Sequence, residues 1–321
     1  MLKYKDFKLI RPNKDQVKKI SELIENKEGS IFHEVELNKI VENTFHTQLF
    51  YLVDDPGNIK CFSPIHITKD KFGLKRYHFK PLYDIPYAGF VGGRELDLNK
   101  LSLGFFDSLK YEGFPFYNLE KSKNKSIKFG ETSMVDLSLE EDEIFTSIIH
   151  SKKRNKIRKA IKEGITVKKY SSLEGLIEFY KILEPLHLKL GFNKKMNLEY
   201  YKRIYNAHND ANQAFVLLAY KDEKLISGVF ILGNMNYMHY YKGASVFGIK
   251  NEGHGELLQW EAIKASKSFG AKYYDLCAIN KEKLPAIYSF KTGISDKIVD
   301  YPIYSKNKLG FQLANRMINL F

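Results

Sequence analysis

The sequence predicts an α/β protein of the α+β kind, and three observations support this. The second half reads as helices, a three-stranded meander, a helix, a strand and a helix. The pattern changes sharply near residue 138, which indicates a domain boundary. At 321 residues and 44% hydrophobic composition, the chain can bury one large core or two modest ones.

The first half supplies helices and a hairpin. Apolar residues at helical spacing predict a helix over 14–27, and a second helix is expected over about 34–45. The apolar runs QLFYLVDD and IKCFSPIHI flank the turn sequence DPGN. Two such runs around a Pro-Gly turn predict a β-hairpin.

The segment 138–164 is predicted to be one helix. Ser-Leu-Glu-Glu at 138–141 has the form of a capping box, and an apolar stripe continues to Gly164. Seven of the eleven residues over 152–162 are Lys or Arg. Arg154 and Arg158 lie one turn apart, so both can grip one phosphate or carboxylate. The alternative is a solvated basic face that complements the helix dipole.

The remaining elements follow in order. Helices are expected at about 172–190 and 197–207. Three strands are expected in AFVLLAYKDEKLISGVFILGNMNYMHYYKGAS, separated by the turn-prone KDEK and GNMN. An amphipathic helix (ELLQWEAIKASKSFG), a strand (AKYYDLCAIN) and a short helix (LPAIYSFKTG) complete the half.

The charge balance favours an anionic partner. Lys and Arg number 51 against 38 Asp and Glu, a net charge of +13. Such a surface attracts nucleic acid, coenzyme phosphates or anionic lipid, although a Lys-rich solubilising surface would look the same. Cys61 and Cys277 lack metal-ligand spacing, which predicts a reducing compartment and no metal. Without a signal-like or membrane-spanning run, we expect a cytoplasmic protein, with peripheral inner-membrane contact left open.

Two glycines stand at the mouth of a predicted helix, in KNEGHGE. The first N–H groups of a helix lack internal partners and attract anions, and glycine lets a phosphate approach the backbone. The predicted pyrophosphate cradle consists of Lys250, Gly253, His254, Gly255 and Glu256. The alternative is a tight turn without a ligand.

These residues resemble a known superfamily. Lys250-Asn-Glu-Gly253-His-Gly255 resembles the Gln/Arg-x-x-Gly-x-Gly/Ala loop of GNAT acyltransferases, and Ala286-Ile-Tyr288-Ser-Phe290-Lys291-Thr-Gly293 resembles their later Ala-x-x-Leu-Tyr segment. A narrower resemblance is to the Fem family of aminoacyltransferases, which form peptidoglycan interpeptide bridges, and to its relatives, the FemAB-like N-acyltransferases. It rests mainly on RNKIRKAIKEG (Arg154 to Gly164), YKGAS, LLQWEAIKASKSFGAKYYDL and FKTG.

The resemblance implies tandem GNAT-like domains, each a mixed central sheet flanked by helices. The first would cover 1–137 and the second 138–304, and the segment 305–321 can pack on the first. The Phe290-Lys291 pair resembles the family's Phe-Lys near the acceptor site, so Phe290 joins Arg154 and Arg158 as a candidate for substrate binding.

Acyl transfer to an amine requires a held donor, an uncharged amine and stabilisation of the tetrahedral intermediate. By the resemblance, Tyr288 is the candidate general acid; the alternative is a half-buried aromatic. Lys291 can hold a carbonyl or carboxylate, or be an exposed helix-end lysine. Asp275 sits in a strand, where a structural pairing is preferred over a role as base. His239 and His254 are weaker candidates for the base.

Three functional hypotheses follow. The first is an N-acyltransferase that moves an acyl group from acyl-CoA to an amine of a cell-envelope or surface-sugar precursor. The second uses aminoacyl-tRNA as donor and a peptidoglycan precursor as acceptor. In both, the acceptor is a small-molecule, nucleotide-linked or lipid-linked amine. The third is a non-catalytic module that binds RNA or anionic glycans.

Overall fold

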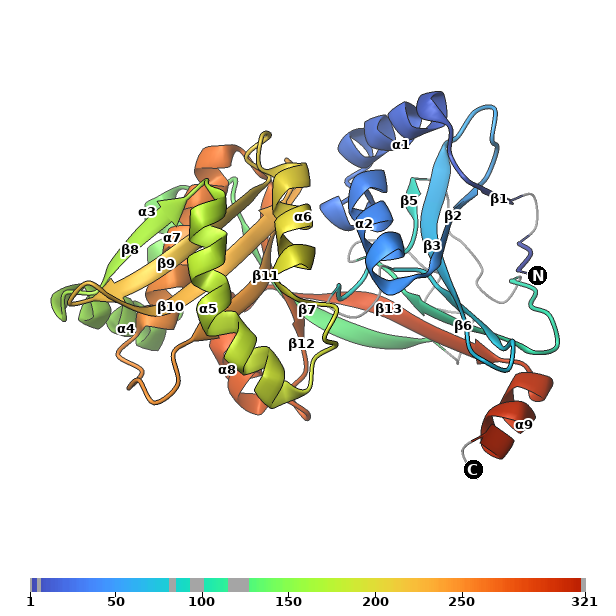
Figure 1. Ribbon diagram of the computed structural model, residues 1–321. Helices are drawn as coiled ribbons and strands as arrows, with labels where there is room; N and C mark the ends of the chain where they lie inside the picture. Colours follow the sequence, from blue (N-terminus) through green and yellow to red (C-terminus); the bar gives the residue numbers. More distant parts are fainter. Residues whose placement is uncertain (1, 5–6, 81–84, 93–100, 115–126, 319–321) are drawn as a thin grey trace. The chain divides into compact units, whose positions relative to one another are not determined.

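The computed structural model describes residues 2–4, 7–80, 85–92, 101–114 and 127–318 (Figure 1). The chain divides into two compact units, Met1–Gly130 with Asp300–Phe321, and Glu131–Val299. It passes between them within strands β7 (Lys128–Asp136) and β13 (Ile298–Asn307). The domain limits at 137 and 304 stay predictions, and residues 319–321 of the segment 305–321 lie outside the described residues.

The first unit begins with the elements that the sequence predicts. Helix α1 covers Lys14–Asn26 and α2 covers Val35–Phe45, after a short 3₁₀ turn. Asn13 caps α1 in a capping box. The hairpin forms from β2 (Gln48–Val53) and β3 (Cys61–Lys69), which pair antiparallel.

The sheet of this unit is mixed. Its order is β1-β2-β3-β4-β6-β13, with β5 also on β3. Strands β4 and β6 are parallel and the other pairs are antiparallel. The further elements are β1 (Lys8–Ile10), β4 (Lys75–His78), β5 (Val91–Gly92), β6 (Asp107–Glu112) and α9 (Leu309–Ile318).

The second unit has a mixed sheet of order β7-β12-β11-β10-β9-β8, in which only β11 and β12 pair in parallel. The strands and helices predicted after residue 170 are confirmed, whereas β7 and β8 were not expected. The elements of this unit, in chain order after α4, are β8 (Thr166–Tyr170), α5 (Leu173–Leu190), α6 (Leu198–His208), β9 (Ala214–Lys221), β10 (Lys224–Gly233), β11 (Tyr237–Ser245), α7 (His254–Phe269), β12 (Tyr273–Ile279) and α8 (Pro285–Thr292).

Helices cover both faces of this second sheet (Figure 1). On β10, Gly228 lies so near α5 that an added Cβ would meet the Phe179 ring at 2.8 Å. The neighbouring Val229 turns to the other face and shares a core with Leu257 and Leu258 of α7. This alternation is the period of a strand buried on both sides. None of the helices in the described ranges is long and apolar enough to cross a membrane.

The prediction of one helix over 138–164 is wrong. The chain forms a single turn α3 (Glu141–Glu143), a π-helical turn over Ile144–Ile148, a break, and then α4 (Ser151–Lys162). Ser138 makes no capping box, because its hydroxyl donates to Asp136 at 2.7 Å. At the break, the His150 N–H donates to the Gly293 carbonyl at 3.0 Å. A tertiary contact therefore interrupts an apolar stripe that continues in sequence.

Candidate acyl-transfer site

The site begins where two parallel strands stop pairing. β11 and β12 pair only over Tyr237–His239 and Tyr273–Asp275, with His239 opposite Asp275. Beyond that point β12 bulges, and its register with β7 jumps from Asp275 to Ala278. A bulge redirects backbone groups that a regular ladder would use. The end of β12 is therefore shaped by its own side chains rather than by β11.

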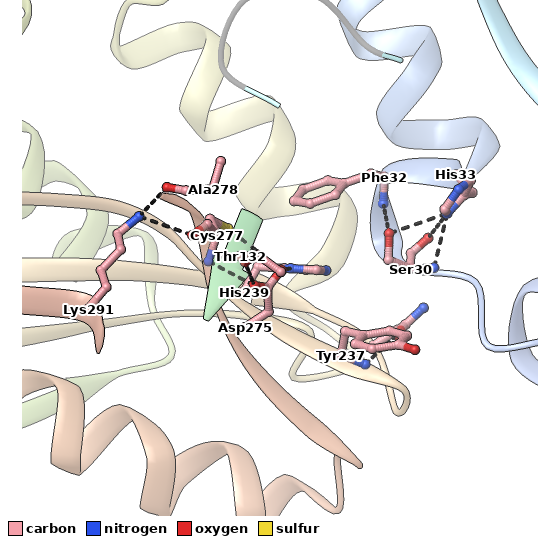
Figure 2. Close-up of polar contacts among 11 residues, drawn as sticks. Ser30, Phe32, His33, Thr132, Tyr237, His239, Asp275, Cys277, Ala278 and Lys291 are labelled. Carbon is pink, nitrogen blue, oxygen red and sulfur yellow. Dashed lines mark hydrogen bonds and ion pairs between the residues drawn. The ribbon is translucent and has the colours of Figure 1, made fainter. Parts of the chain in front are cut away.

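A buried carboxylate organises this bulge. Asp275 is fully buried, and its Oδ1 accepts from the Thr132 hydroxyl at 2.6 Å and from the Cys277 N–H at 2.8 Å (Figure 2). Its Oδ2 accepts from Nδ1 of His239 at 2.7 Å. Because a carboxylate can only accept, Nδ1 carries the proton. These bonds offset the free energy needed to bury the charge.

Cys277 adopts a backbone conformation that non-glycine residues avoid. Its φ is +62°, in the left-handed region. The bond from its N–H to Asp275 holds this conformation. The carbonyls of Cys277 and Ala278 then accept from Nζ of Lys291 at 3.4 and 3.1 Å (Figure 2). The strained residue thus links the carboxylate to the lysine.

Lys291 is a buried cation rather than an exposed helix-end lysine, with 9% of its surface exposed. Its Nζ also lies 5.6 Å from the centre of the Tyr240 ring on β11. Burial lowers the pKa of Lys291 and the Lys242 charge also lowers it, whereas the Asp275 charge offsets part of this shift. The contacts to two carbonyls use two of the three ammonium hydrogens. The remaining donor can stabilise a developing oxyanion.

His239, Asp275 and Cys277 also have the composition of a metal site. Their donor atoms lie within 4.8 Å of one another. However, the His239–Asp275 separation of 2.7 Å is a hydrogen bond. Burial, and then the Asp275 charge, raise the pKa of the Cys277 thiol well above its usual range, so the thiol is protonated. These contacts suit a hydrogen-bond network, and the sequence prediction of no metal remains a prediction.

The glycines at the mouth of α7 differ in their surroundings. Gly253 caps the helix with φ +97°, and an added Cβ would lie 2.2 Å from the Lys156 carbonyl oxygen of α4. Close approach of two helices therefore explains Gly253 without a ligand. At Gly255 an added Cβ would make only ordinary contact, 3.5 Å from the Phe290 ring. Packing does not require Gly255, and Lys250 is exposed nearby in sequence.

Glu256 is the least expected member of the predicted cradle. Its carboxylate is buried and binds the ammonium groups of Lys153 at 3.1 Å and Lys156 at 3.0 Å. Burial alone would raise the pKa of Glu256, but the hydrogen bonds and charges of these lysines lower it overall. Burial also lowers the pKa of His254. Part of the positive charge of α4 is thus neutralised beside the helix mouth.

The two arginines of α4 act separately. Arg154 donates to the carbonyls of Thr146 and Ile149, the latter at 2.7 Å, and so caps the π-helical turn. Arg158 is exposed and lies over the Phe145 ring, 5.3 Å from its centre. The structure therefore does not bring their guanidinium groups together on one free anion site.

Helix α8 brings two more predicted residues to the region. The Phe290 ring lies 4.9 Å from Nζ of Lys153, beside Gly255. Tyr288 is half-buried and precedes Lys291 by three residues, which places both on neighbouring positions of one helix face. The structure thus joins Asp275 to Lys291 and Phe290 to the α7 mouth. Sequence reasoning missed Thr132, Cys277 and Tyr240, and did not pair His239 with Asp275.

The sequence comparisons identify one domain. Residues 151–291 match the family of the acetyltransferase (GNAT) domain. No curated protein matches the chain. The matched segment runs from the first residue of α4 to Lys291, so it includes the candidate site except Thr132 on β7.

Solved structures share the fold of this chain over most of its length. FemX superimposes with a TM-score of 0.70 at 13% identity, covering 95% of this chain and 99% of FemX. The C-terminal domain of a putative lysylphosphatidylglycerol synthetase from Agrobacterium fabrum gives 0.57 at 11%, with 95% and 96% covered. A tandem GNAT protein from the clavulanic acid pathway gives 0.51 at 10%, with 96% and 99% covered. The predicted tandem GNAT-like fold is confirmed.

Proposed function

We propose that this chain, which contains a GNAT acetyltransferase domain and has a fold like that of FemX, moves an acyl group from acyl-CoA to an amine of a cell-envelope or surface-sugar precursor. The observation that carries the proposal is the position of Lys291. Its buried ammonium lies where β11 and β12 stop pairing and keeps one N–H donor for a substrate. Acyl transfer needs such a donor, placed before the reaction starts, where negative charge develops.

The proposed reaction is direct attack. The neutral amine of the acceptor bonds to the thioester carbonyl carbon, and the carbonyl oxygen becomes an oxyanion that accepts from Lys291. The intermediate then collapses and the carbon–sulfur bond breaks. Tyr288 is the proposed donor of the proton that the leaving thiolate takes, and the extra proton of the amine nitrogen is released to solvent, from which the Tyr288 phenolate regains a proton. The protonated, buried Cys277 has no covalent role in this scheme.

Asp275 acts indirectly, through the position of Lys291. It touches the bulge and not the reacting atoms, so it is a positioning residue for Lys291 through Cys277. Thr132 and His239 fix the carboxylate in turn. Each of these bonds is buried, which makes the arrangement stiff before any substrate arrives.

The mouth of α7 is the proposed binding site for the CoA phosphates. The N–H groups of His254, Gly255 and Glu256 begin the helix, where no helical acceptor exists for them. Space at Gly255 permits a phosphate to approach. Lys250 is exposed and can add charge. Phe290 and Arg158 are the residues we propose for contact with the acceptor.

A second donor, aminoacyl-tRNA, is favoured by a specific observation. Glu256 places a carboxylate beside the α7 mouth and forms ion pairs with Lys153 and Lys156. The positive charge left to attract a pyrophosphate there is therefore smaller. The rest of α4 still exposes basic residues, namely Lys152, Arg158, Lys159 and Lys162, and such a row suits the phosphates of RNA. With this donor the acceptor would be a peptidoglycan precursor.

A transfer assay separates the donors. The purified protein is incubated with acetyl-CoA or with charged tRNA, each with an amino-sugar nucleotide and with a nucleotide-linked peptidoglycan precursor, and products are identified by mass spectrometry. An acetylated amine that Lys291→Met abolishes supports the proposal. Product from charged tRNA alone assigns the second donor. Absence of product with both donors and every acceptor would overturn the proposed reaction. We also propose that the reaction takes place in the cytoplasm, where both donors are available.

A further inference from the structure

An apolar stripe runs along the last helix of the first unit. Leu309, Leu313 and Met317 are 60%, 50% and 63% exposed, and their spacing of four residues places them on one side of α9. The opposite side carries the buried Phe311, which packs the helix onto its unit. The helix is thus attached by one face and presents the other to solvent.

Other exposed aromatic side chains lie at the end of the sheet where this helix begins. The adjacent Phe105 and Phe106 are 58% and 54% exposed, and the Phe311 N–H donates to the Phe105 carbonyl at 3.3 Å. Phe72, at the turn between β3 and β4, is 57% exposed. Strand β4 pairs with β6 directly after Phe106, so these turns lie at the same end of the sheet.

The charges around the stripe are predominantly basic. The Arg76 guanidinium lies 5.2 Å from the centre of the Phe311 ring and donates to Asn315, which ties β4 to α9. Lys71 lies over Phe72, and Arg316 is exposed on α9 itself. The acidic neighbours are paired or buried: Asp70, whose side chain is 22% exposed, pairs with Arg76 at 3.7 Å, and Asp107 is buried.

We propose that this surface, the α9 patch (Phe72, Phe105, Phe106, Leu309, Leu313, Met317), docks on an anionic lipid bilayer. Exposed apolar side chains enter the boundary of headgroups and acyl chains, and flanking Lys and Arg side chains contact lipid phosphates. Aromatic and aliphatic tips ringed by cations match an anionic membrane better than a protein surface, which would have to supply both a groove and acids.

Vesicle co-sedimentation of the full chain tests the inference without any catalytic readout. Vesicles of phosphatidylglycerol and phosphatidylcholine in equal amounts are compared with pure phosphatidylcholine. We expect binding to the anionic vesicles that weakens with salt, and at least about a tenfold loss in the variant Leu313→Glu/Met317→Glu. Both side chains are exposed, so the variant should fold, and circular dichroism and thermal unfolding check this.

The matched control is Leu188→Glu/Leu190→Glu, which adds the same charge at exposed leucines on α5 of the second unit (72% and 60% exposed). An equal loss of vesicle binding in both variants would mean that only the net charge of the protein matters, and would overturn the assignment to α9. No binding to anionic vesicles would overturn it directly. A dimer in light scattering that Leu313→Glu/Met317→Glu dissolves would assign the patch to a second copy of the chain instead. Transfer activity in solution is independent of every one of these outcomes.

Discussion

The Asp275 carboxylate holds the N–H of Cys277 at 2.8 Å and so fixes a left-handed residue inside a strand. The carbonyls of Cys277 and Ala278 consequently face the ammonium of Lys291. Asp275 can therefore set the position of the Lys291 ammonium, which we propose contacts the reacting carbonyl oxygen.

Asp275→Asn should lower kcat at least about tenfold with little change in KM, because Lys291 loses its fixed position. Glycine adopts the left-handed conformation without strain. The double variant Asp275→Asn/Cys277→Gly should therefore recover part of the rate. Steady-state kinetics of both variants, with Asp136→Asn on β7 as control, check this. Full activity of Asp275→Asn would remove the positioning role.

The rate should depend on protonated Lys291. Since burial lowers its pKa from 10.5, the ammonium is lost at a lower pH than in a free lysine, and kcat should fall as pH rises through that lowered pKa. Lys291→Arg, which stays charged, should hold its smaller rate to higher pH. Lys291→Met should reduce kcat about a hundredfold or more. Superimposable pH profiles for wild type and Lys291→Arg would contradict the role.

Substitution of the two glycines at the start of α7 should affect the stability of the protein unequally. Gly253→Ala forces a Cβ to within 2.2 Å of a backbone oxygen at φ +97°, which should lower the free energy of unfolding by at least about 2 kcal/mol. Gly255→Ala meets only ordinary contacts and should leave stability within about 0.5 kcal/mol. Urea unfolding measures both. Equal destabilisation would refute this division of roles.

Stability should fall in mild acid because of His66. This histidine is fully buried, and burial lowers its pKa to about 3. Nε2 donates to Asn38 at 2.9 Å and Nδ1 accepts from Thr47 at 2.8 Å, so the ring is neutral. Its folded pKa lies below the unfolded value of about 6.5, so the unfolded state binds more protons as pH falls from about 6.5 toward 3, and stability is lost over that window.

The measurement is urea unfolding of wild type and His66→Gln at a series of pH values. The variant should be less stable than wild type at pH 7. Its free energy of unfolding should, however, fall less steeply with decreasing pH, by up to about 1.4 kcal/mol per pH unit. Some slope should remain, because burial also lowers the pKa of His78 and of His208, each to about 4. Identical slopes in the two proteins would contradict the assignment to His66.

The sequence predicted elements well where local pattern decides them. The hairpin at DPGN and the helices α1, α5 and α7 follow from turn residues and helical periodicity. The break at His150 could not be predicted, because the apolar pattern of the sequence continues through this position. The helix is interrupted by the hydrogen bond from His150 to Gly293, which is distant in sequence. Strands β7 and β8 were missed for lack of a clear alternation.

The candidate site was predictable only in part. Asp275 stood out as a carboxylate within a strand, and the structure shows that it is held by hydrogen bonds. Nothing in the sequence marks Cys277 as left-handed, since glycine is the usual sign of that conformation. Thr132 and Asp275 are far apart in sequence and meet only through the pairing of β7 with β12. Such contacts depend on topology, which periodicity does not report.

Calorimetric titration with acetyl-CoA tests the central claim most directly. Wild type and Gly255→Val are compared, with thermal unfolding to show that both are folded. We predict micromolar binding by wild type that Gly255→Val abolishes, because the added branches would occupy the space left for a phosphate at the α7 mouth. The account would be contradicted if folded wild type binds no acetyl-CoA, or if both proteins bind it equally.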